Sequence, residues 1–209
     1  MIRIVIADDH TIVREGLKQM LDASQDFAVV GEACNGHEVL VRTRELEFDL
    51  LLLDMSMPGR SGIELIRQVK SEKPKLRILI LSMHEEQQYA VRAIRAGASG
   101  YLTKGTAEAQ LVLAIRKVAS GGAFITPGVA EQIALGAMPN AEGPLHSTLS
   151  DREFQVMRLL VAGKSITDIA SELNLSVKTV STHKTRLMLK MGMTNQADLI
   201  RYAMENNLD

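Results

Sequence analysis

Residues 50–59 read Leu-Leu-Leu-Leu-Asp-Met-Ser-Met-Pro-Gly, a run of four leucines that ends in an aspartate and a turn. Such an uninterrupted apolar run, bounded by a turn signal, is typical of a strand buried on both faces, as in a parallel sheet covered by helices. The carboxyl ends of parallel strands form the edge at which α/β proteins bind ligands. The sequence therefore places Asp54 at an edge suited to chemistry.

Three other strand-like stretches also end in polar side chains. They are residues 4–7 before Asp8 and Asp9, residues 78–81 before Ser82, and residues 99–102 before Thr103 and Lys104. A fifth strand-like stretch covers residues 28–32. If these strands lie parallel in one sheet, three carboxylates, a hydroxyl and an ammonium converge on a single edge.

Helical periodicity alternates with these strands. It covers residues 11–23, 36–46, 61–70, 87–96 and 107–120. Alternating strands and helices predict a parallel sheet with helices on both faces and right-handed crossovers. We expect a flavodoxin-like, doubly wound, five-stranded α/β domain with its site at the switch point of the sheet.

A cluster of carboxylates needs a compensating proton or cation, because neighbouring negative charges repel one another. Mg²⁺ binds oxygen ligands at roughly 2.0–2.1 Å, uses one or two carboxylates, and completes its shell with water and phosphate oxygens. This chemistry favours a phosphoryl-accepting site in which Asp54 is the nucleophile. Lys104 and Ser82 would stabilise the phosphoryl charge.

Each of these residues also has an ordinary structural explanation. An aspartate after a strand often caps a helix or forms a turn, so Asp8 and Asp9 could cap the helix that starts near Thr11. Lys104 alone would usually be solvated, and Ser82 alone a turn hydroxyl. The agreement among four strand ends makes the functional interpretation the stronger one.

The composition limits the other possibilities. The chain is 46% hydrophobic and 3% aromatic, with 11 Met and no Trp, which predicts aliphatic cores, and its 209 residues fit two domains. It contains neither a Gly-x-Gly-x-x-Gly motif nor a P-loop. The N-terminus enters a strand directly and no apolar run is long enough for a membrane span, so we expect a cytoplasmic protein. Cys34 is the one cysteine in the sequence, and we expect a small buried or half-buried residue, not a reactive thiol.

Residues 1 to about 120 resemble the receiver domain of two-component response regulators. The matching residues are Asp8-Asp9, Asp54 with Met57-Pro58-Gly59, Ser82, the stretch Ala-Gly-Ala-Ser-Gly-Tyr at 96–101, and Lys104. One difference is Gly105, because many receivers have a proline there, after a cis bond.

The resemblance implies a role for each site residue. Asp54 would be the phosphoacceptor, and Mg²⁺ or Mn²⁺ would be bound by Asp9, Asp54 and the carbonyl of Ser56, with Asp8 acting through water. Ser82 and Tyr101 would form a conformational switch. Lys104 would contact the phosphoryl group.

The rest of the chain reads as a linker followed by a small all-α domain. We divide the sequence into a domain at 1–121, a linker with a short helix at 122–144, and a domain at 145–209. Ser150 and Glu153 form a capping-box pattern at the start of a helix that runs to about Ala162. Further helices are predicted at 165–173, 177–191 and 195–206. The helices at 165–173 and 177–191, joined by a tight turn at 174–176, form a helix-turn-helix.

The helix predicted at 177–191 is basic. No acidic residue occurs between Leu173 and Ala197, a stretch that contains Lys178, Lys184, Arg186 and Lys190. A solvated helix face is the ordinary explanation, but the preceding helix and turn favour DNA binding. We expect Val177, Val180, Leu187 and either Leu189 or Met191 to face the core.

Residues 145–209 resemble the LuxR/NarL-type DNA-binding domain. The matching stretches are 149–153, 163–165, 168–170 and 175–180, together with His183. We expect Ser181, Thr182, Lys184 and Thr185 to read bases, and Lys178, Thr179 and Arg186 to anchor phosphates; His183 would either pack against the turn or touch phosphate. The resemblance also implies that the fourth helix supplies a dimerisation surface on DNA, with Ala197, Leu199, Ile200 and Ala203.

The two halves together resemble a NarL/FixJ-class response regulator. Such a protein is a transcription factor that a sensor histidine kinase phosphorylates and that then binds DNA as a dimer, so we do not expect a metabolic enzyme. One alternative is a phosphatase or mutase with an aspartyl nucleophile, although those resemble Asp-x-Asp and here Ser56 follows Asp54 by two residues. Another is a regulator that binds DNA without phosphorylation.

Overall fold

The computed structural model describes the chain except for residues 58–61, 84–86, 136–143, 207 and 209. Pro58 and Gly59 of the turn after Asp54, and residues 136–143 of the predicted linker, therefore lie outside the described residues. The chain divides into two compact units, Met1–Leu135 and Gly136–Asp209. Among the described residues, no helix combines the length and the apolar character needed to cross a membrane.

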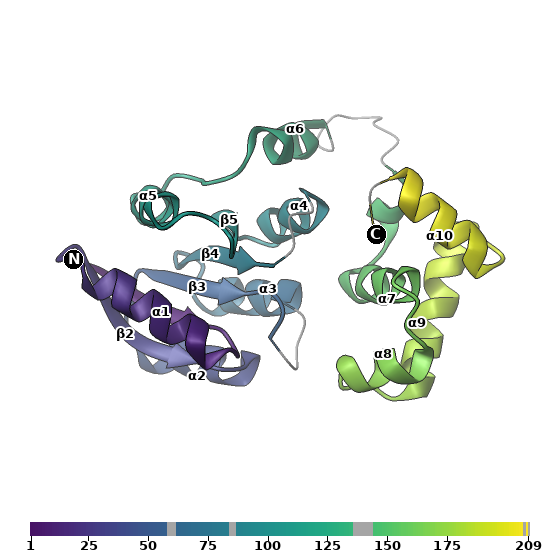
Figure 1. Cartoon of the computed structure of the whole chain (residues 1–209), viewed down its shortest axis with the longest axis horizontal. Coiled ribbons are helices and arrows are strands. Elements are labelled where there is room, and N and C mark those ends of the chain that lie inside the picture. Colours follow the sequence, from purple (N-terminus) through teal and green to yellow (C-terminus); the bar gives the residue numbers. More distant parts are fainter. Residues whose placement is uncertain (58–61, 84–86, 136–143, 207, 209) are drawn as a thin grey trace. The chain divides into compact units, whose positions relative to one another are not determined.

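The first unit is built on a parallel sheet (Figure 1). Its strands are β1 (Ile2–Ala7), β2 (Phe27–Ala33), β3 (Leu50–Asp54), β4 (Arg77–Ser82) and β5 (Gly100–Thr103). They pair in the order β2-β1-β3-β4-β5, with every neighbouring pair parallel. The predicted flavodoxin-like, doubly wound topology is confirmed.

Helices cover both faces of this sheet. They are α1 (Thr11–Asp22), α2 (Gly36–Glu45), α3 (Gly62–Glu72), α4 (Gln87–Arg95) and α5 (Glu108–Ala119). Successive strand residues point to opposite faces, so Leu51 and Leu53 pack with α2, α3 and α4, whereas Leu50 and Leu52 pack with α1 and α5. All five residues of β3 are buried, which explains why the leucine run is uninterrupted.

The segment after α5 also belongs to the first unit. Phe124 pairs with the edge strand β5: its N–H donates to the Ser99 carbonyl at 3.0 Å, and its carbonyl accepts the Tyr101 N–H at 3.0 Å. The helix α6 (Pro127–Leu135) follows, and Val129 is buried in the same apolar cluster as Ala90 of α4. The short helix predicted within residues 122–144 is thus present, and the first unit includes it.

The second unit consists of helices. They are the 3₁₀ helix η1 (Leu145–Thr148), α7 (Asp151–Val161), α8 (Ile166–Glu172), α9 (Val177–Lys190) and α10 (Gln196–Glu205). The capping box at the start of α7 is confirmed, with Ser150 Oγ accepting the Glu153 N–H at 3.3 Å and Glu153 Oε2 accepting the Ser150 N–H at 2.8 Å. Between α8 and α9, Asn174 takes a positive φ of 52°, which closes the short turn of the predicted helix-turn-helix.

Cys34 corrects one expectation. Its side chain is exposed at the end of β2, and its Sγ lies 3.1 Å from Glu38 Oε1. The prediction of a buried or half-buried cysteine was wrong because β2 ends at Ala33, and Cys34 lies in the short connection to α2, which begins at Gly36.

Candidate functional site

The predicted acidic residues converge at the carboxyl edge of the sheet. Asp8 follows β1, Asp54 ends β3, and Lys104 follows β5. The Lys104 Nζ lies 2.6 Å from Asp8 Oδ2 and 2.9 Å from Asp54 Oδ2. Both carboxylates are about 1% exposed, so this ammonium compensates two negative charges inside the protein.

Strand pairing fixes this arrangement. Asp54 pairs with Leu81 and Ser82 with Thr103, so the ends of β3, β4 and β5 lie in register. The Lys104 N–H then donates to the Ser82 carbonyl at 2.8 Å, which holds the loop after β5 against β4. No described peptide bond is cis, and the bond between Lys104 and Gly105 is therefore trans.

The electrostatics of Asp54 and Lys104 depend on each other. Burial raises the pKa of the Asp54 carboxyl above its ordinary value, and the nearby negative charge of Asp8 raises it further. The Lys104 ammonium and the Ser56 N–H, which donates to Asp54 Oδ1 at 3.1 Å, oppose this rise. Burial acts to lower the pKa of Lys104, but its contacts with Asp8 and Asp54 outweigh this effect, so the Lys104 pKa is raised. The lysine is held in its charged form by the two carboxylates.

A hard divalent cation fits this donor set. Asp8, Asp9, His10 and Asp54 each offer one ligand atom, and these atoms all lie within 4.8 Å of one another. Asp8 Oδ2 and Asp54 Oδ2 are buried, and among the described residues they have only the ion-pair contact with Lys104, without regular hydrogen-bond geometry. Asp9 is exposed, which leaves its carboxylate open to an ion from solvent. The composition is that of an oxygen-rich site of the kind Mg²⁺ prefers.

Two residues that the sequence reasoning missed support this site. His10 Nδ1 lies 3.2 Å from Asp8 Oδ1 and 3.1 Å from Asp9 Oδ1. Arg14 on α1 donates from Nη1 to the Asp8 carbonyl at 2.8 Å and from Nε to Glu32 on β2 at 3.1 Å, so it ties the loop after β1 to the sheet. His10 could have been included from the sequence, because it directly follows Asp8 and Asp9. The contacts of Arg14 could not be predicted from the sequence, because they depend on how α1 packs against the sheet.

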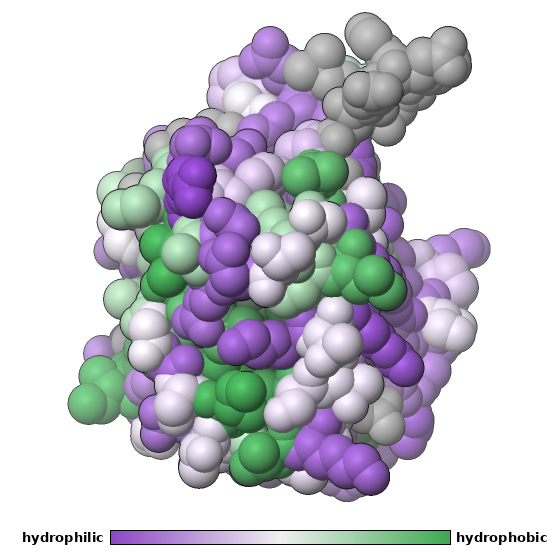
Figure 2. Space-filling view, turned by 90° about the vertical axis from the view of Figure 1, so that its right-hand side faces the viewer, coloured by the Kyte–Doolittle hydropathy of each residue, from purple (hydrophilic) through white to green (hydrophobic). Residues whose placement is uncertain are grey.

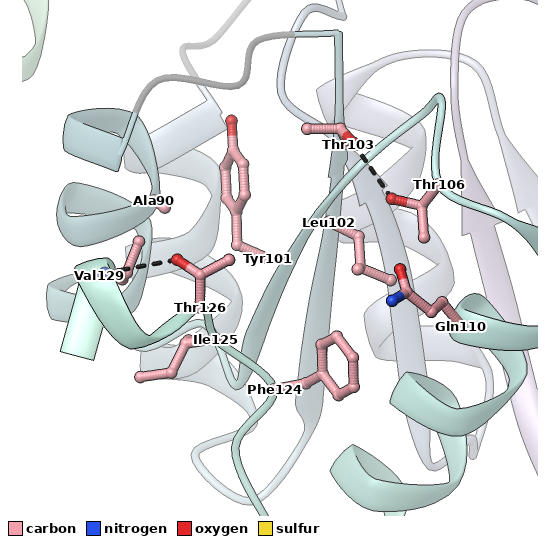
Figure 3. A pocket seen from close by; sticks show the side chains of 10 residues that line it. All are labelled: Ala90, Tyr101, Leu102, Thr103, Thr106, Gln110, Phe124, Ile125, Thr126 and Val129. Carbon is pink, nitrogen blue, oxygen red and sulfur yellow. Dashed lines mark hydrogen bonds between the residues drawn. The ribbon is translucent and has the colours of Figure 1, made fainter.

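The two predicted switch residues lie on neighbouring strands. Ser82 at the end of β4 is 1% exposed and Tyr101 on β5 is 8% exposed. Tyr101 borders a pocket of about 380 Å³ between β5, α4, α5 and the segment that leads into α6. Figure 3 shows the Tyr101 ring in this pocket on the same side as Ala90 and Val129, with Thr106 and Gln110 on the other side.

The predicted DNA-contacting residues divide by exposure along α9. Exposed members are Lys178, Thr182, Thr185 and Arg186, whereas Thr179, Ser181, His183 and Lys184 are half-buried. The Lys184 Nζ donates to Gln196 Oε1 on α10 at 3.2 Å, so this lysine is held toward its own unit. Figure 2 shows hydrophobic and hydrophilic side chains interspersed on the side that carries the C-terminal helices.

The core-facing residues of α9 differ in part from the prediction. Val180 and Leu187 are completely buried and Met191 is 3% exposed, as predicted. Val177 is 49% and Leu189 81% exposed, so the inward placement of Val177 was wrong, and of the two alternatives Met191 is the core residue. Val177 is the first residue of α9 and directly follows the N-cap residue Ser176.

The predicted dimerisation surface on α10 also needs correction. Leu199 and Ala203 are completely buried in the unit's own core, so their assignment to a surface was wrong. They lie four residues apart on one face of the helix, and this face packs inward. Ala197 is exposed and Ile200 half-buried, so these two residues remain available to a partner.

Known proteins resemble the chain in both units. Residues 4–116 match the family model described as response regulator receiver domain, and residues 147–203 match that of the bacterial regulatory proteins of the luxR family. The response regulator UvrY of Escherichia coli (strain K12) is 36% identical over 210 residues, which covers 100% of this chain and 96% of UvrY. The response regulator GacA of Pseudomonas viridiflava is 35% identical over 209 residues, with 100% and 98% covered.

A solved structure extends this similarity to the whole fold. RcsB of Salmonella enterica serovar Typhimurium, bound to the promoter rprA in the presence of the phosphomimetic BeF₃⁻, has 30% sequence identity and a TM-score of 0.67. The similarity covers 98% of this chain and 99% of the RcsB chain. These relatives are regulators, which agrees with the expectation that the chain is not a metabolic enzyme. The chain belongs to the two-component response regulators of the NarL/FixJ class, in which a receiver domain precedes a LuxR-type helix-turn-helix domain.

Proposed function

We propose that the protein is a transcription factor whose affinity for DNA is controlled by phosphorylation of Asp54. The donor is the phosphohistidine of a sensor kinase, as the family implies. A carboxylate oxygen of Asp54 forms a bond to phosphorus while the bond from phosphorus to the donor imidazole nitrogen breaks, and the leaving nitrogen takes up a proton. The observation that carries this proposal is the convergence of Asp8, Asp54 and Lys104 at one sheet edge, with contacts of 2.6 and 2.9 Å.

A bound Mg²⁺ would supply positive charge that neutralises the phosphoryl group. Asp9, Asp54 and the Ser56 carbonyl would hold Mg²⁺, with Asp8 bound through water. Lys104 already contacts the Asp54 oxygen that faces it, so it needs only a small movement to contact a phosphoryl oxygen instead. The chain thus supplies the compensating charges before the donor arrives, which is the preorganisation that phosphoryl transfer requires.

Ser82 and Tyr101 would carry the signal away from Asp54. A hydrogen bond from the Ser82 hydroxyl to the phosphoryl group would draw this residue toward Asp54 and change the space available to the Tyr101 ring. The two residues sit on adjacent paired strands, Ile80 opposite Tyr101 and Ser82 opposite Thr103, which supports such coupling. A contact made only in the phosphorylated state shifts the population toward that state.

The output would be dimerisation on double-stranded DNA in the cytoplasm. The exposed side chains of Lys178, Thr182, Thr185 and Arg186 support α9 as the helix that enters the major groove. Among the half-buried residues, Ser181 and Lys184 are proposed to read bases from the middle of the helix, Thr179 to anchor phosphate, and His183 to pack near the turn or touch phosphate. Ala197 and Ile200 are the residues of α10 proposed to contact a second copy.

Intact-mass spectrometry after incubation with acetyl phosphate and Mg²⁺ tests the proposed phosphoacceptor. The wild-type chain should gain one phosphoryl group, and Asp54→Asn should gain none. Asp22→Asn, which changes an exposed aspartate at the end of α1, is the matched control and should behave as wild type. One stable added phosphoryl group on Asp54→Asn would overturn the assignment.

A further inference from the structure

His10 stands beside the two acidic residues at the end of β1. Its Nδ1 lies 3.2 Å from Asp8 Oδ1 and 3.1 Å from Asp9 Oδ1, while its backbone N–H donates to Asp8 Oδ1 at 2.9 Å. The backbone contact fixes the residue against the loop. The imidazole is 65% exposed, so the ring can turn about its own side-chain bonds.

These separations match those of neighbouring ligands around one metal ion. In an octahedral shell with bonds of about 2.1 Å, adjacent ligand atoms lie about 3 Å apart. The ligand atoms of His10, Asp8, Asp9 and Asp54 all lie within 4.8 Å of one another. The imidazole nitrogen is therefore close enough to share an ion with these carboxylates.

Lys104 does not compete for this position. It contacts the Oδ2 atoms of Asp8 and Asp54, whereas His10 faces the Oδ1 atoms of Asp8 and Asp9. A cation near His10 would approach the cluster from the exposed side, where Asp9 is open to solvent. The lysine can remain in its ion pairs while the ion binds.

We propose that His10 is a nitrogen ligand that makes this acidic site select first-row transition-metal dications over Mg²⁺. An imidazole suits Zn²⁺, Ni²⁺, Fe²⁺ and similar ions, whereas Mg²⁺ prefers oxygen donors and gives up its waters reluctantly. His10 therefore strengthens binding of the first group and contributes little to Mg²⁺. This inference rests on the proposed function in one respect, namely that the acidic cluster is the metal site.

The test compares Co²⁺ and Mg²⁺ binding to the full chain at one fixed pH by isothermal titration calorimetry. His10→Gln should weaken Co²⁺ binding by about tenfold or more, a typical loss for residues that tune a metal site, and should change Mg²⁺ binding by less than about twofold. His37→Gln, at an exposed histidine near the start of α2, should leave both affinities at the wild-type value. His10→Asn is a second variant, and circular dichroism of each variant verifies that it folds.

A spectroscopic measurement separates ligation from an indirect effect. The proton spectrum of the Co²⁺-loaded wild-type chain should contain a strongly shifted imidazole ring signal that is absent from His10→Gln. An unchanged ratio of Co²⁺ to Mg²⁺ affinity in both His10 variants, or the same shifted signal in His10→Gln, overturns the inference and leaves the proposed function standing. Asp9→Ala should weaken the binding of both Co²⁺ and Mg²⁺. Wild-type affinities in that variant would show that the acidic cluster is not the metal site, which would contradict both proposals.

Discussion

Removal of the Lys104 ammonium should make the stability of the first unit strongly dependent on pH. In Lys104→Met, Asp8 and Asp54 keep their burial at about 1% exposure but lose the cation that lies 2.6 and 2.9 Å from them. Truncating one partner of a buried ion pair typically costs about 3–5 kcal/mol. The variant can limit this loss by protonating one carboxyl, most readily Asp54, whose pKa burial already raises.

Protonation sets an upper bound on the loss. Protonating a carboxyl with an unfolded-state pKa of about 3.9 costs roughly 1.4 kcal/mol for each pH unit above that pKa. The stability lost in Lys104→Met is therefore at most about 4 kcal/mol at pH 7 and about 1.5 kcal/mol at pH 5. Because the folded-state pKa of Asp54 is raised, the folded variant binds more protons than the unfolded chain. The contribution of Asp54 to stability is therefore greatest below its unfolded-state pKa and is lost as the pH rises through the folded-state pKa. In the wild-type chain the same dependence of stability on pH is weaker, because Lys104 opposes the rise of the Asp54 pKa.

Amide hydrogen exchange of β3, measured in EDTA at pH 5 and pH 7, gives the local free energy of opening for wild type and variant. Lys73→Met is the matched control, because Lys73 pairs with the exposed Glu47 at 2.9 Å and its loss should cost less than about 1 kcal/mol at both pH values. Equal protection of β3 in wild type and Lys104→Met at pH 7 would show that the Lys104 ammonium does not stabilise the buried carboxylates. A loss that does not shrink at pH 5 would refute the role of protonation.

Three further predictions concern the switch, the DNA helix and the second core. Ser82→Ala should still accept phosphate but should dimerise more weakly when phosphorylated, and unchanged dimerisation in analytical ultracentrifugation would remove Ser82 from the mechanism. Lys178→Ala should weaken binding to all DNA sequences alike and reduce the slope of log affinity against log salt by about one. Lys184→Ala should lose about 1–3 kcal/mol of binding free energy on specific DNA only. Equal losses on specific and scrambled DNA in a salt titration would show that Lys184 is another phosphate contact. Leu187→Ala, at a completely buried position, should lower the free energy of unfolding by about 2–5 kcal/mol, whereas Leu189→Ala, at 81% exposure, should change it by less than about 0.5 kcal/mol in urea titrations.

The sequence predicted the sheet and its acidic edge because the two signals coincide. Each strand is a short apolar run, and in a parallel sheet the residue after each run lies at the same edge, so Asp8, Asp54 and Lys104 could be brought together from order alone. The contacts of Arg14 with the Asp8 carbonyl and Glu32 could not, because Arg14 lies within helix α1 and strand order does not say where a helix side chain reaches.

The errors in the second unit lie on helices that have more than one apolar face. On α10, Leu199 and Ala203 pack inward while Ile200 and Met204 are partly or mostly exposed, and the sequence of one helix does not say which apolar face meets the core. On α9 the same ambiguity separates the exposed Leu189 from the buried Met191. Tertiary packing, and not periodicity, decides between such faces.

Phosphorylation control of DNA binding is tested most directly by measuring the affinity of the full chain for DNA with and without phosphate on Asp54. DNA selected from a random pool would be titrated with wild type and with Asp54→Asn, each with and without acetyl phosphate and Mg²⁺. Phosphorylation should tighten wild-type binding by roughly 5- to 150-fold, the usual range of coupling between sites, and should leave the affinity of Asp54→Asn unchanged. Equal affinity of the wild-type chain in both states would contradict this control and would identify a regulator that binds DNA without phosphorylation.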